Sequence, residues 1–180
     1  MRFDRTCRSC GQPHGKPVAR GNGFEHSVTH SGDLVAVAVA RAPVGVDVEQ
    51  LDGRARPLGG DGDPQALARL VLADGERDAL AAVRPADRTR AFMVAWTRKE
   101  AVTKATGDGL RVSFSDVVVA GAPGTPRLVS WPYPKAPESV SLLDLEADTG
   151  YVAALAVIGH CEEVAARDGP ALLAGNTPAG

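Results

Sequence analysis

Two acidic residues on one short apolar segment are the first candidates for chemistry in this 180-residue sequence. Asp47 and Glu49 alternate with the valines of Val44-Gly-Val-Asp-Val-Glu49, so a strand would place both carboxylates on one face. Two carboxylates this close repel each other unless a cation lies between them. They are either the solvated face of an edge strand or ligands for a hard divalent ion such as Mg²⁺, which prefers a few carboxylates together with substrate phosphates.

A second set of candidates lies on a predicted helix. Trp96, Glu100 and Lys104 are spaced four residues apart and therefore share one side of that helix. The helix is predicted between about Asp87, a good N-cap, and Gly107, a good residue for the C′ position. Glu100 and Lys104 are either an ordinary surface pair or a partly buried carboxylate and ammonium, whose desolvation would be costly without a ligand.

Two motifs near the start of the chain could hold phosphate. His30 lies between Thr29 and Ser31, and these three hydrogen-bonding groups at a strand entrance suit a phosphate. A hydrogen-bonded core histidine is the alternative. Lys16, in Gly15-Lys-Pro17, is a cationic point charge on a stiff turn, which is also compatible with phosphate.

The composition limits the kind of protein that carries these motifs. With 44% hydrophobic and 23% charged residues, the chain can form one domain with a core, or two small lobes. A net charge of −2 provides no basic field for nucleic acid or an anionic membrane, and the apolar runs are the size of strands. The three cysteines are an odd number for a disulfide framework and no secretory signal is visible, so the expected location is cytoplasmic.

The elements that would position these residues are strands and helices in alternation. The sequence predicts a strand buried on both faces over Leu34–Ala40, followed by a strand over 44–49 as its antiparallel hairpin partner. Further segments are predicted as helices at 64–73, 75–83 and 87–107, strands at 116–120, 139–145 and 151–158, and a loop at 53–63. The predicted fold class is therefore α+β, an antiparallel sheet packed against helices.

Taken in order, these motifs resemble those of the 4′-phosphopantetheinyl transferases, in particular the larger, pseudo-dimeric type. The matching segments are Gly15-Lys-Pro17, Ser27-Val-Thr-His-Ser31, Gly45-Val-Asp-Val-Glu49 and Trp96-Thr-Arg-Lys-Glu-Ala101, followed by Lys104, Gly107 and Gly109. The similarity covers about residues 10–158. The sequence departs from the family where Ser27 and Thr29 stand in place of the usual Asn and Ser. Lysine is scarce, at 4 residues against 16 arginines, and three of the four lie in these motifs: Lys16, Lys99 and Lys104.

The resemblance implies a reaction and a set of ligands. The 4′-phosphopantetheine arm of coenzyme A (CoA) would be transferred to a serine of an apo acyl or peptidyl carrier protein, with release of 3′,5′-ADP. Mg²⁺, or Mn²⁺, would be bound by Asp47, Glu49 and Glu100. Glu100 would also accept the serine proton, and Lys104 would neutralise the pyrophosphate. The residues implied to bind CoA are Lys16, Thr29, His30, Lys99 and Lys104.

The resemblance also implies a division of the chain. Residues 1–43 would be the remnant of an N-terminal lobe with the CoA phosphate motifs, 44–159 the transferase lobe with the metal site, and 160–180 a disordered tail. Family members of this type carry a further segment before the Gly-Lys-Pro turn. We therefore expect an uncovered flank on the strand Leu34–Ala40, and a natural protein that extends upstream of Met1.

Other interpretations use the same residues. Cys7, Cys10 and His14 form half of a zinc site, for which His26 and His30 are the nearby fourth candidates; otherwise they shape the turn that leads to Gly15. A truncated or degenerate family member could bind CoA or a carrier protein without turnover. A metal-dependent nucleotide hydrolase could use the same carboxylates.

Overall fold

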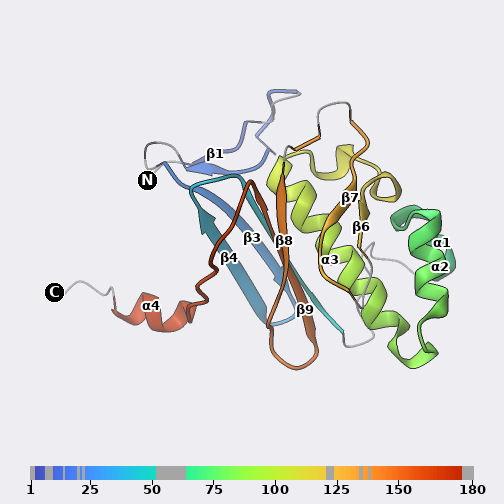
Figure 1. The fold of residues 1–180 in the computed structure, drawn as a ribbon. Coiled ribbons are helices and arrows are strands. Elements are labelled where there is room, and N and C mark those ends of the chain that lie inside the picture. Colours follow the sequence, from blue (N-terminus) through green and yellow to red (C-terminus); the bar gives the residue numbers. More distant parts are fainter. Residues whose placement is uncertain are drawn as a thin grey trace.

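A long helix lies against a small antiparallel sheet, with a two-stranded hairpin alongside (Figure 1). The computed structural model describes residues 3–6, 10–13, 15–19, 21, 23–51, 64–120, 124–133, 136–137 and 139–175. The strands in these ranges are β1 (Phe3–Asp4), β2 (Val18–Ala19), β3 (Glu25–Ser31), β4 (Leu34–Ala40), β5 (Val44–Gln50), β6 (Val118–Val119), β7 (Leu128–Ser130), β8 (Val140–Leu145) and β9 (Tyr151–Ile158). The helices are α1 (Pro64–Val71), α2 (Asp74–Ala82), α3 (Arg88–Thr106) and α4 (Gly169–Gly175), with 3₁₀ turns at Pro85–Asp87, Gly109–Arg111 and Phe114–Asp116.

The central sheet has the strand order β5-β9-β8, and both pairings are antiparallel. β9 is the middle strand and is buried along 152–157. Helix α3 packs on this sheet through small side chains, with Ala101 and Ala105 on the helix near Ala154 and Ala156 of β9. Alanines on both sides let the helix and the sheet approach closely.

One glycine brings the helix and β5 into direct backbone contact. A Cβ atom at Gly45 would lie 2.0 Å from the carbonyl oxygen of Ala101 and 2.5 Å from the amide nitrogen of Ala105, so only glycine fits there. The residues that follow Gly45 on β5 are thereby held against the last two turns of α3. This contact decides which side chains can meet.

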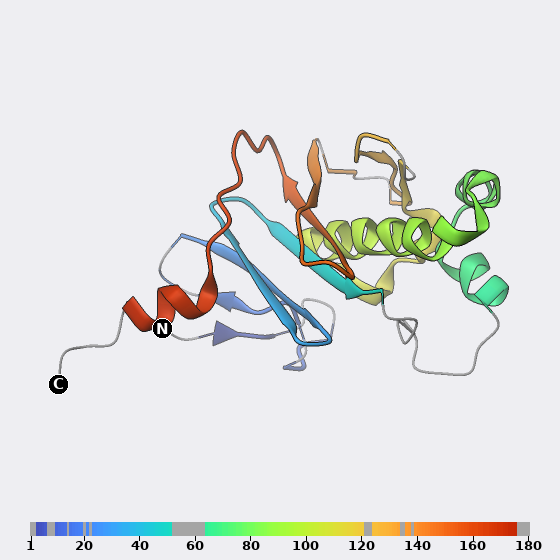
Figure 2. The ribbon, with the colours of Figure 1, turned by 90° about the horizontal axis from the view of Figure 1, so that it is seen from below.

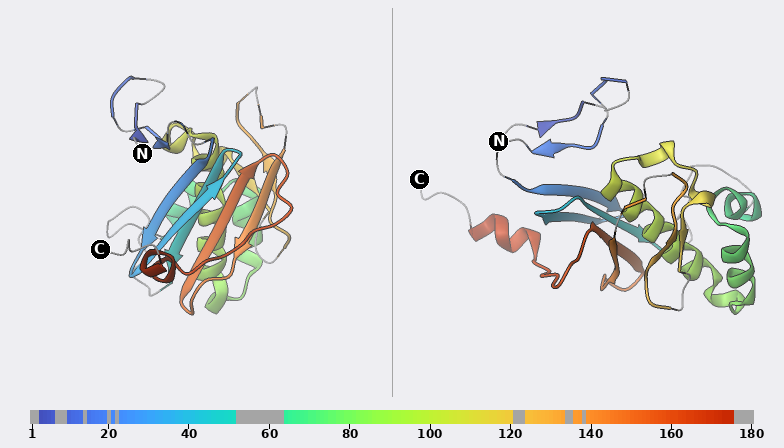
Figure 3. Two further views of the ribbon diagram at one scale, coloured as in Figure 1. Left: turned by 90° about the vertical axis from the view of Figure 1, so that its left-hand side faces the viewer. Right: turned by 45° about the horizontal axis from the view of Figure 1, so that its top comes forward.

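Strands β3 and β4 form their own antiparallel hairpin, with Thr29 opposite Ala36. The predicted hairpin between the strands at 34–40 and 44–49 is wrong, because β4 pairs with β3 while β5 pairs with β9. The carbonyl oxygen of Pro43 accepts a hydrogen bond from the N–H of Ile158 in β9, so pairing with β9 starts one residue before β5. In Figure 3 the hairpin strands run beside those of the sheet, with α3 behind them.

Strand β4 is half-buried on one face and exposed on the other, contrary to the prediction of two buried faces. Its alanines pack toward a cluster that includes Val44 and Leu155, whereas Val35, Val37 and Val39 are exposed. The alternation of side chains along a strand produces this division. The expected uncovered flank is therefore present as a row of exposed valines.

The remaining predicted elements agree more closely with the structure. Helix α3 ends at Gly107, whose φ of 79° is left-handed and whose N–H bonds to Thr103. The predicted helices at 64–73 and 75–83 correspond to α1 and α2, and the strands at 139–145 and 151–158 to β8 and β9. Of the predicted strand at 116–120, only β6 is extended in this way.

Two further regions were predicted to lack regular structure. Within 160–180, helix α4 forms at Gly169–Gly175 and extends away from the sheet (Figure 2). Residues 53–63, predicted as a loop, and residues 176–180 lie outside the described residues. No helix in the described ranges is long and apolar enough to cross a membrane.

Candidate active site

Asp47, in the middle of β5, is the most buried of the three carboxylates predicted to bind metal. The residue is 3% exposed, and its Oδ1 accepts hydrogen bonds from Lys104 Nζ at 2.6 Å and from Thr29 Oγ1 at 3.1 Å. Its Oδ2 is buried without a hydrogen-bond partner. Burial raises the pKa of Asp47 to about 7, although the Lys104 ammonium opposes this effect. At neutral pH the Asp47 carboxyl group therefore populates both its charged and its neutral form.

Glu100 and Lys104 face β5 from α3. Lys104 donates to the carbonyl oxygen of Val46 at 3.3 Å as well as to Asp47. Burial raises the pKa of Glu100, the Lys104 ammonium lowers it, and the Glu49 carboxylate raises it further. Helix and strand therefore bring three carboxylates and one ammonium within electrostatic reach of one another.

Glu49 lies two residues beyond Asp47 on β5. Its Oε2 accepts a hydrogen bond from Ser31 Oγ at 2.8 Å, and the same hydroxyl accepts the N–H of Gln50 at 3.1 Å. Glu49 also raises the pKa of Asp47, which places the two carboxylates close enough to repel. The sequence grouped Ser31 with Thr29 and His30 as hydrogen-bonding groups suited to a phosphate, so its contact with Glu49 was not predicted.

The donor atoms of this cluster suit a hard divalent cation. Asp47 Oδ2 is a buried oxygen without a partner, and such atoms in folded proteins are normally satisfied. Glu49 and Glu100 both disfavour the charge of Asp47, and Glu49 also disfavours that of Glu100. A cation between the three carboxylates would relieve this repulsion and would give Asp47 Oδ2 a partner. Among the described residues, no group of three or more His, Cys, Asp or Glu side chains is already gathered as a metal site.

Lys16 lies at the C-terminal end of α3, next to the start of β5. Its ammonium donates to the carbonyl oxygens of Val44 at 2.9 Å and Ala105 at 3.4 Å, and lies 3.7 Å from the carboxylate of Glu25. A cation at this end of a helix is favoured by the helix dipole. The structure therefore places the Lys16 ammonium against the first residue of β5, the strand that carries Asp47.

Thr29 and His30 point to opposite faces of β3. The Thr29 side chain is buried and bonds to Asp47, whereas His30 is exposed. The hydroxyl of Thr29 and the imidazole of His30 therefore do not meet at one point, although the sequence grouped them as a phosphate motif. His30 lies on the same face of the hairpin as the exposed valines of β4.

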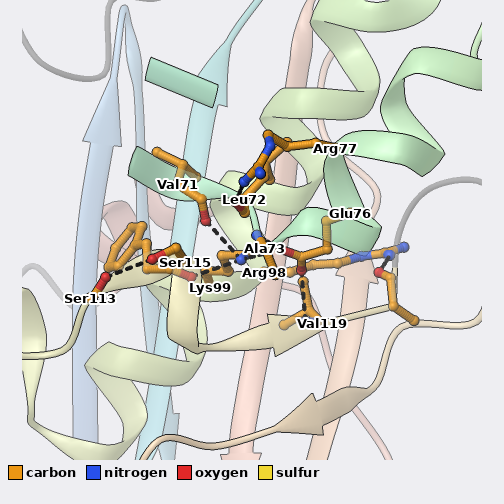
Figure 4. A network of polar contacts seen from close by, with 12 residues as sticks. Val71, Leu72, Ala73, Glu76, Arg77, Arg98, Lys99, Ser113, Ser115 and Val119 are labelled. Carbon is orange, nitrogen blue, oxygen red and sulfur yellow. Dashed lines mark hydrogen bonds and ion pairs between the residues drawn. The ribbon is translucent and has the colours of Figure 1, made fainter. Parts of the chain in front are cut away.

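Lys99 lies elsewhere in the molecule than its predicted role requires (Figure 4). Its ammonium is fully buried and donates to Glu76 Oε2 and to the carbonyl oxygens of Val71 and Phe114, both at 2.8 Å. Burial lowers the pKa of Lys99. The prediction that Lys99 holds a CoA phosphate is therefore wrong, because successive helix residues point about 100° apart and Lys99 faces α1 and α2 while Glu100 faces β5.

Two further buried polar contacts hold the helix in place and were missed from the sequence. Arg98 donates to both carboxylate oxygens of Asp144 on β8, at 2.8 and 2.6 Å. Glu76, the partner of Lys99, also accepts the N–H of Val119 at 2.9 Å. The signal was available: Arg98, Lys99 and Glu100 are consecutive in a helix, so they cannot all lie on one solvent-facing side.

The predicted half of a zinc site cannot be assembled from the structure. Cys7 and His14 lie outside the described residues, and Cys10 is exposed. The zinc interpretation therefore stays a prediction. Trp96, one turn before Glu100, is buried and contacts Phe114 edge to face, with ring centroids 5.2 Å apart, so it belongs to the core beside the site.

Comparison with known proteins gives the following relatives. The model of the 4′-phosphopantetheinyl transferase superfamily matches residues 43–156. The 4′-phosphopantetheinyl transferase psf-1 of Bacillus pumilus is 38% identical over 104 residues, which cover 57% of this chain and 40% of that protein. The 4′-phosphopantetheinyl transferase HetI of a Nostoc species is 32% identical over 165 residues, which cover 88% of this chain and 61% of that protein. The chain thus spans about two fifths to three fifths of their length.

Solved structures share the fold. The holo-[acyl-carrier-protein] synthase of Thermotoga maritima superposes with a TM-score of 0.51 at 24% identity, over 65% of this chain and 62% of that chain. The holo-(acyl-carrier-protein) synthase of Bacillus anthracis, in complex with CoA (3′,5′-ADP), has a TM-score of 0.50 at 23% identity, over 65% and 95%. The predicted α+β fold class is confirmed. With the family model matched across β5, α3 and β9, this chain belongs to the 4′-phosphopantetheinyl transferase superfamily.

Proposed function

We propose that this chain transfers the 4′-phosphopantetheine arm of CoA to a serine hydroxyl of an apo carrier protein, with Mg²⁺ as the metal and 3′,5′-ADP as the second product. The observation that carries the proposal is the contact between β5 and α3, which joins Asp47, Glu100 and Lys104 in one partly buried cluster. Membership of the superfamily and the CoA bound to the B. anthracis relative support the choice of substrate.

The metal would be held by Asp47, Glu49 and Glu100. Bound there, Mg²⁺ would neutralise negative charge on the CoA pyrophosphate and on the carboxylates. Asp47 Oδ2 is the oxygen best suited to bind the metal, because it is buried and has no hydrogen-bond partner among the described residues. Mn²⁺ offers the same preference for oxygen ligands and would substitute for Mg²⁺.

Glu100 and Lys104 would carry out the proton transfer and the charge neutralisation. The serine oxygen forms a bond to the β-phosphorus of CoA while the bond from that phosphorus to the 3′,5′-ADP oxygen breaks. The serine proton passes to Glu100, directly or through a water molecule, and the raised pKa of Glu100 favours its acceptance. The Lys104 side chain is 28% exposed and its ammonium lies beside Asp47, so it can face the oxygen that leaves with 3′,5′-ADP.

Lys16 and His30 are the residues we retain for the phosphates of CoA. Lys16 lies at the end of α3, close to the β5 strand that carries Asp47. His30 is exposed on the outer face of β3, so it can contact only a part of CoA that reaches this face. Residues 44–159 would contain the metal site, and the reaction would take place in the cytoplasm, where CoA and carrier proteins occur.

The deciding experiment follows a fluorescent pantetheine arm from labelled CoA to an apo carrier protein. We expect a labelled carrier and an equal amount of 3′,5′-ADP, both abolished by EDTA and by Glu100→Gln. Glu146→Gln, an exposed carboxylate at the end of β8, is the matched control and should retain activity. Labelling that persists in EDTA would contradict the metal assignment.

The same assay separates the other functions considered. A nucleotide hydrolase would release 3′,5′-ADP from CoA without any carrier protein. A binding protein would bind CoA, by calorimetry, and release no 3′,5′-ADP. Either result with a folded chain would refute the proposed transfer.

A further inference from the structure

Strand β3 directs three hydroxyl side chains toward β5 at every second position: Ser27, Thr29 and Ser31. The alternation of a strand places them on one face, and Ser27 and Thr29 are buried there. β5 is an edge strand of its sheet, since β9 pairs with its other side. The hydroxyl row therefore meets β5 along an edge that no strand of that sheet covers.

The three hydroxyls make two kinds of contact with β5. Ser27 Oγ accepts the N–H of Val46 at 3.1 Å, and Ser31 Oγ accepts the N–H of Gln50 at 3.1 Å. These bonds satisfy backbone donors that would otherwise lack a partner. Thr29 and Ser31 in addition donate to carboxylates that the proposed function assigns to the metal, whereas Ser27 makes no such contact within the described part of the chain.

The contact of Thr29 decides which oxygen of Asp47 is available. Oδ1 receives hydrogen bonds from Thr29 and from Lys104, while the buried Oδ2 receives none. Two donors on one oxygen restrict the rotation of the carboxylate and leave the other oxygen for a further ligand. Ser31 restrains Glu49 with one donor, through a 2.8 Å hydrogen bond to Oε2.

We propose that Thr29 and Ser31 are positioning residues for the divalent ion: their hydroxyls orient the Asp47 and Glu49 carboxylates that bind it. Hydrogen bonds from outside a metal site orient the ligands, and their loss commonly weakens metal affinity by 10-fold to 100-fold. The inference rests on the proposed function, because the ion is the one that the transfer reaction requires. It gives Thr29 a different role from the phosphate contact expected from the sequence.

Direct titration with Mn²⁺, followed by electron paramagnetic resonance, tests this role without catalysis. The metal is titrated alone and again with saturating CoA. We expect Thr29→Val and Ser31→Ala each to weaken Mn²⁺ binding about tenfold, and Thr29→Ser, which keeps the hydroxyl, to bind within twofold of wild type. Ser27→Ala is the matched control from the same strand and face. It should lower stability through Val46 but leave Mn²⁺ affinity unchanged.

Steady-state kinetics give a second readout. In Thr29→Val the KM for Mg²⁺ should rise about tenfold while the KM for CoA stays within twofold. A rise in the KM for CoA with unchanged metal affinity would overturn the proposal in favour of a phosphate contact. Equal losses of metal affinity in Ser27→Ala and Thr29→Val would also overturn it, because the row would then act only through the fold. If Thr29→Val does not fold, Ser31→Ala carries the test.

The two proposals fail in different ways. Wild-type protein that binds Mn²⁺ with the expected pattern among the variants, but transfers no pantetheine, would refute the transferase function and leave the positioning role intact. Protein that transfers pantetheine with equal metal affinity in all variants would refute the positioning role alone. Absence of Mn²⁺ binding in wild type, with and without CoA, would overturn the positioning proposal.

Discussion

Replacing Asp47 by asparagine should stabilise the metal-free fold at alkaline pH while it abolishes transfer. Burial disfavours the charged form of Asp47 more strongly than Lys104 favours it, which raises the pKa of the carboxyl to about 7. Asparagine has nearly the same shape, keeps an oxygen for the Thr29 hydroxyl and carries no charge at any pH. Lys104 is partly exposed, so water can solvate its ammonium in the variant.

The size and sign of the effect follow from the pKa of Asp47 in the two states. The pKa rises from 3.8 to about 7 on folding, so the folded protein binds this proton more tightly than the unfolded chain. The stability linked to the proton is fully present below about pH 4, is lost as the pH rises to about 7, and is constant above it. A difference of about three in pKa corresponds to about 4 kcal/mol.

Chemical denaturation in EDTA at several pH values measures this difference. We expect wild type and Asp47→Asn to have similar free energies of unfolding at pH 4, and the variant to be more stable by up to about 4 kcal/mol at pH 8. The difference between the two proteins removes most of the contribution from other carboxyl groups. Asp78→Asn, an exposed carboxylate on α2, should show no such pH dependence.

Two results would refute this reasoning. A variant that is less stable than wild type at pH 8 would mean that the ion pair with Lys104 outweighs the desolvation of Asp47. A difference in stability that does not change with pH would mean that the carboxyl titrates normally. In either case the charge on Asp47 would not destabilise the folded, metal-free protein.

Three further predictions concern the elements around the site. Gly45→Ala should lower the free energy of unfolding by about 2–3 kcal/mol, because the new Cβ would meet the backbone of α3. Gly75 on α2 has open space around it, so Gly75→Ala should not be destabilising. Equal effects of the two substitutions would contradict the close approach of α3 and β5 at Gly45. Lys99→Met should lower the free energy of unfolding by about 3–5 kcal/mol, because Glu76 would be left buried without its cation. The KM for CoA should be unchanged in the folded variant. A raised KM for CoA with an unchanged free energy of unfolding would restore the CoA-binding role of Lys99. Lys104→Ala should weaken CoA binding by calorimetry and slow transfer, and wild-type values in both measurements would exclude a role for its ammonium.

Local sequence signals were sufficient for the helix that carries the site. The end of α3 at Gly107 depends on backbone groups within one turn, which neighbouring residues alone satisfy. At its start the helix follows Asp87 as predicted, but the Asp87 side chain makes no capping hydrogen bond. The spacing of Glu100 and Lys104 likewise follows from helix geometry. Alternation on β5 predicted Asp47 and Glu49 on one face, and the effect of the Glu49 carboxylate, which raises the pKa of Asp47, agrees with this placement.

Strand pairing was not a local property. A short link between 34–40 and 44–49 favours a hairpin in any isolated segment, yet β5 pairs with β9, about a hundred residues later in the chain. The energy that decides this pairing comes from burying β5 and β9 against α3. Lys99 illustrates the same limit, because its ammonium meets Glu76, a residue 23 positions away that no spacing rule connects with it.

The sequence by itself determined the family and the approximate bounds of the main helices and strands, because motif spacing and helix or strand periodicity are written in neighbouring residues. The three carboxylates that it nominates as metal ligands stay a prediction. Only the tertiary structure decided that Lys104 and Thr29 share one oxygen of Asp47 and that Lys99 is buried on the other side of α3. The physical reason is the close approach at Gly45: hydrogen bonds and desolvation act over a few ångströms, and these distances exist only after distant segments have packed together.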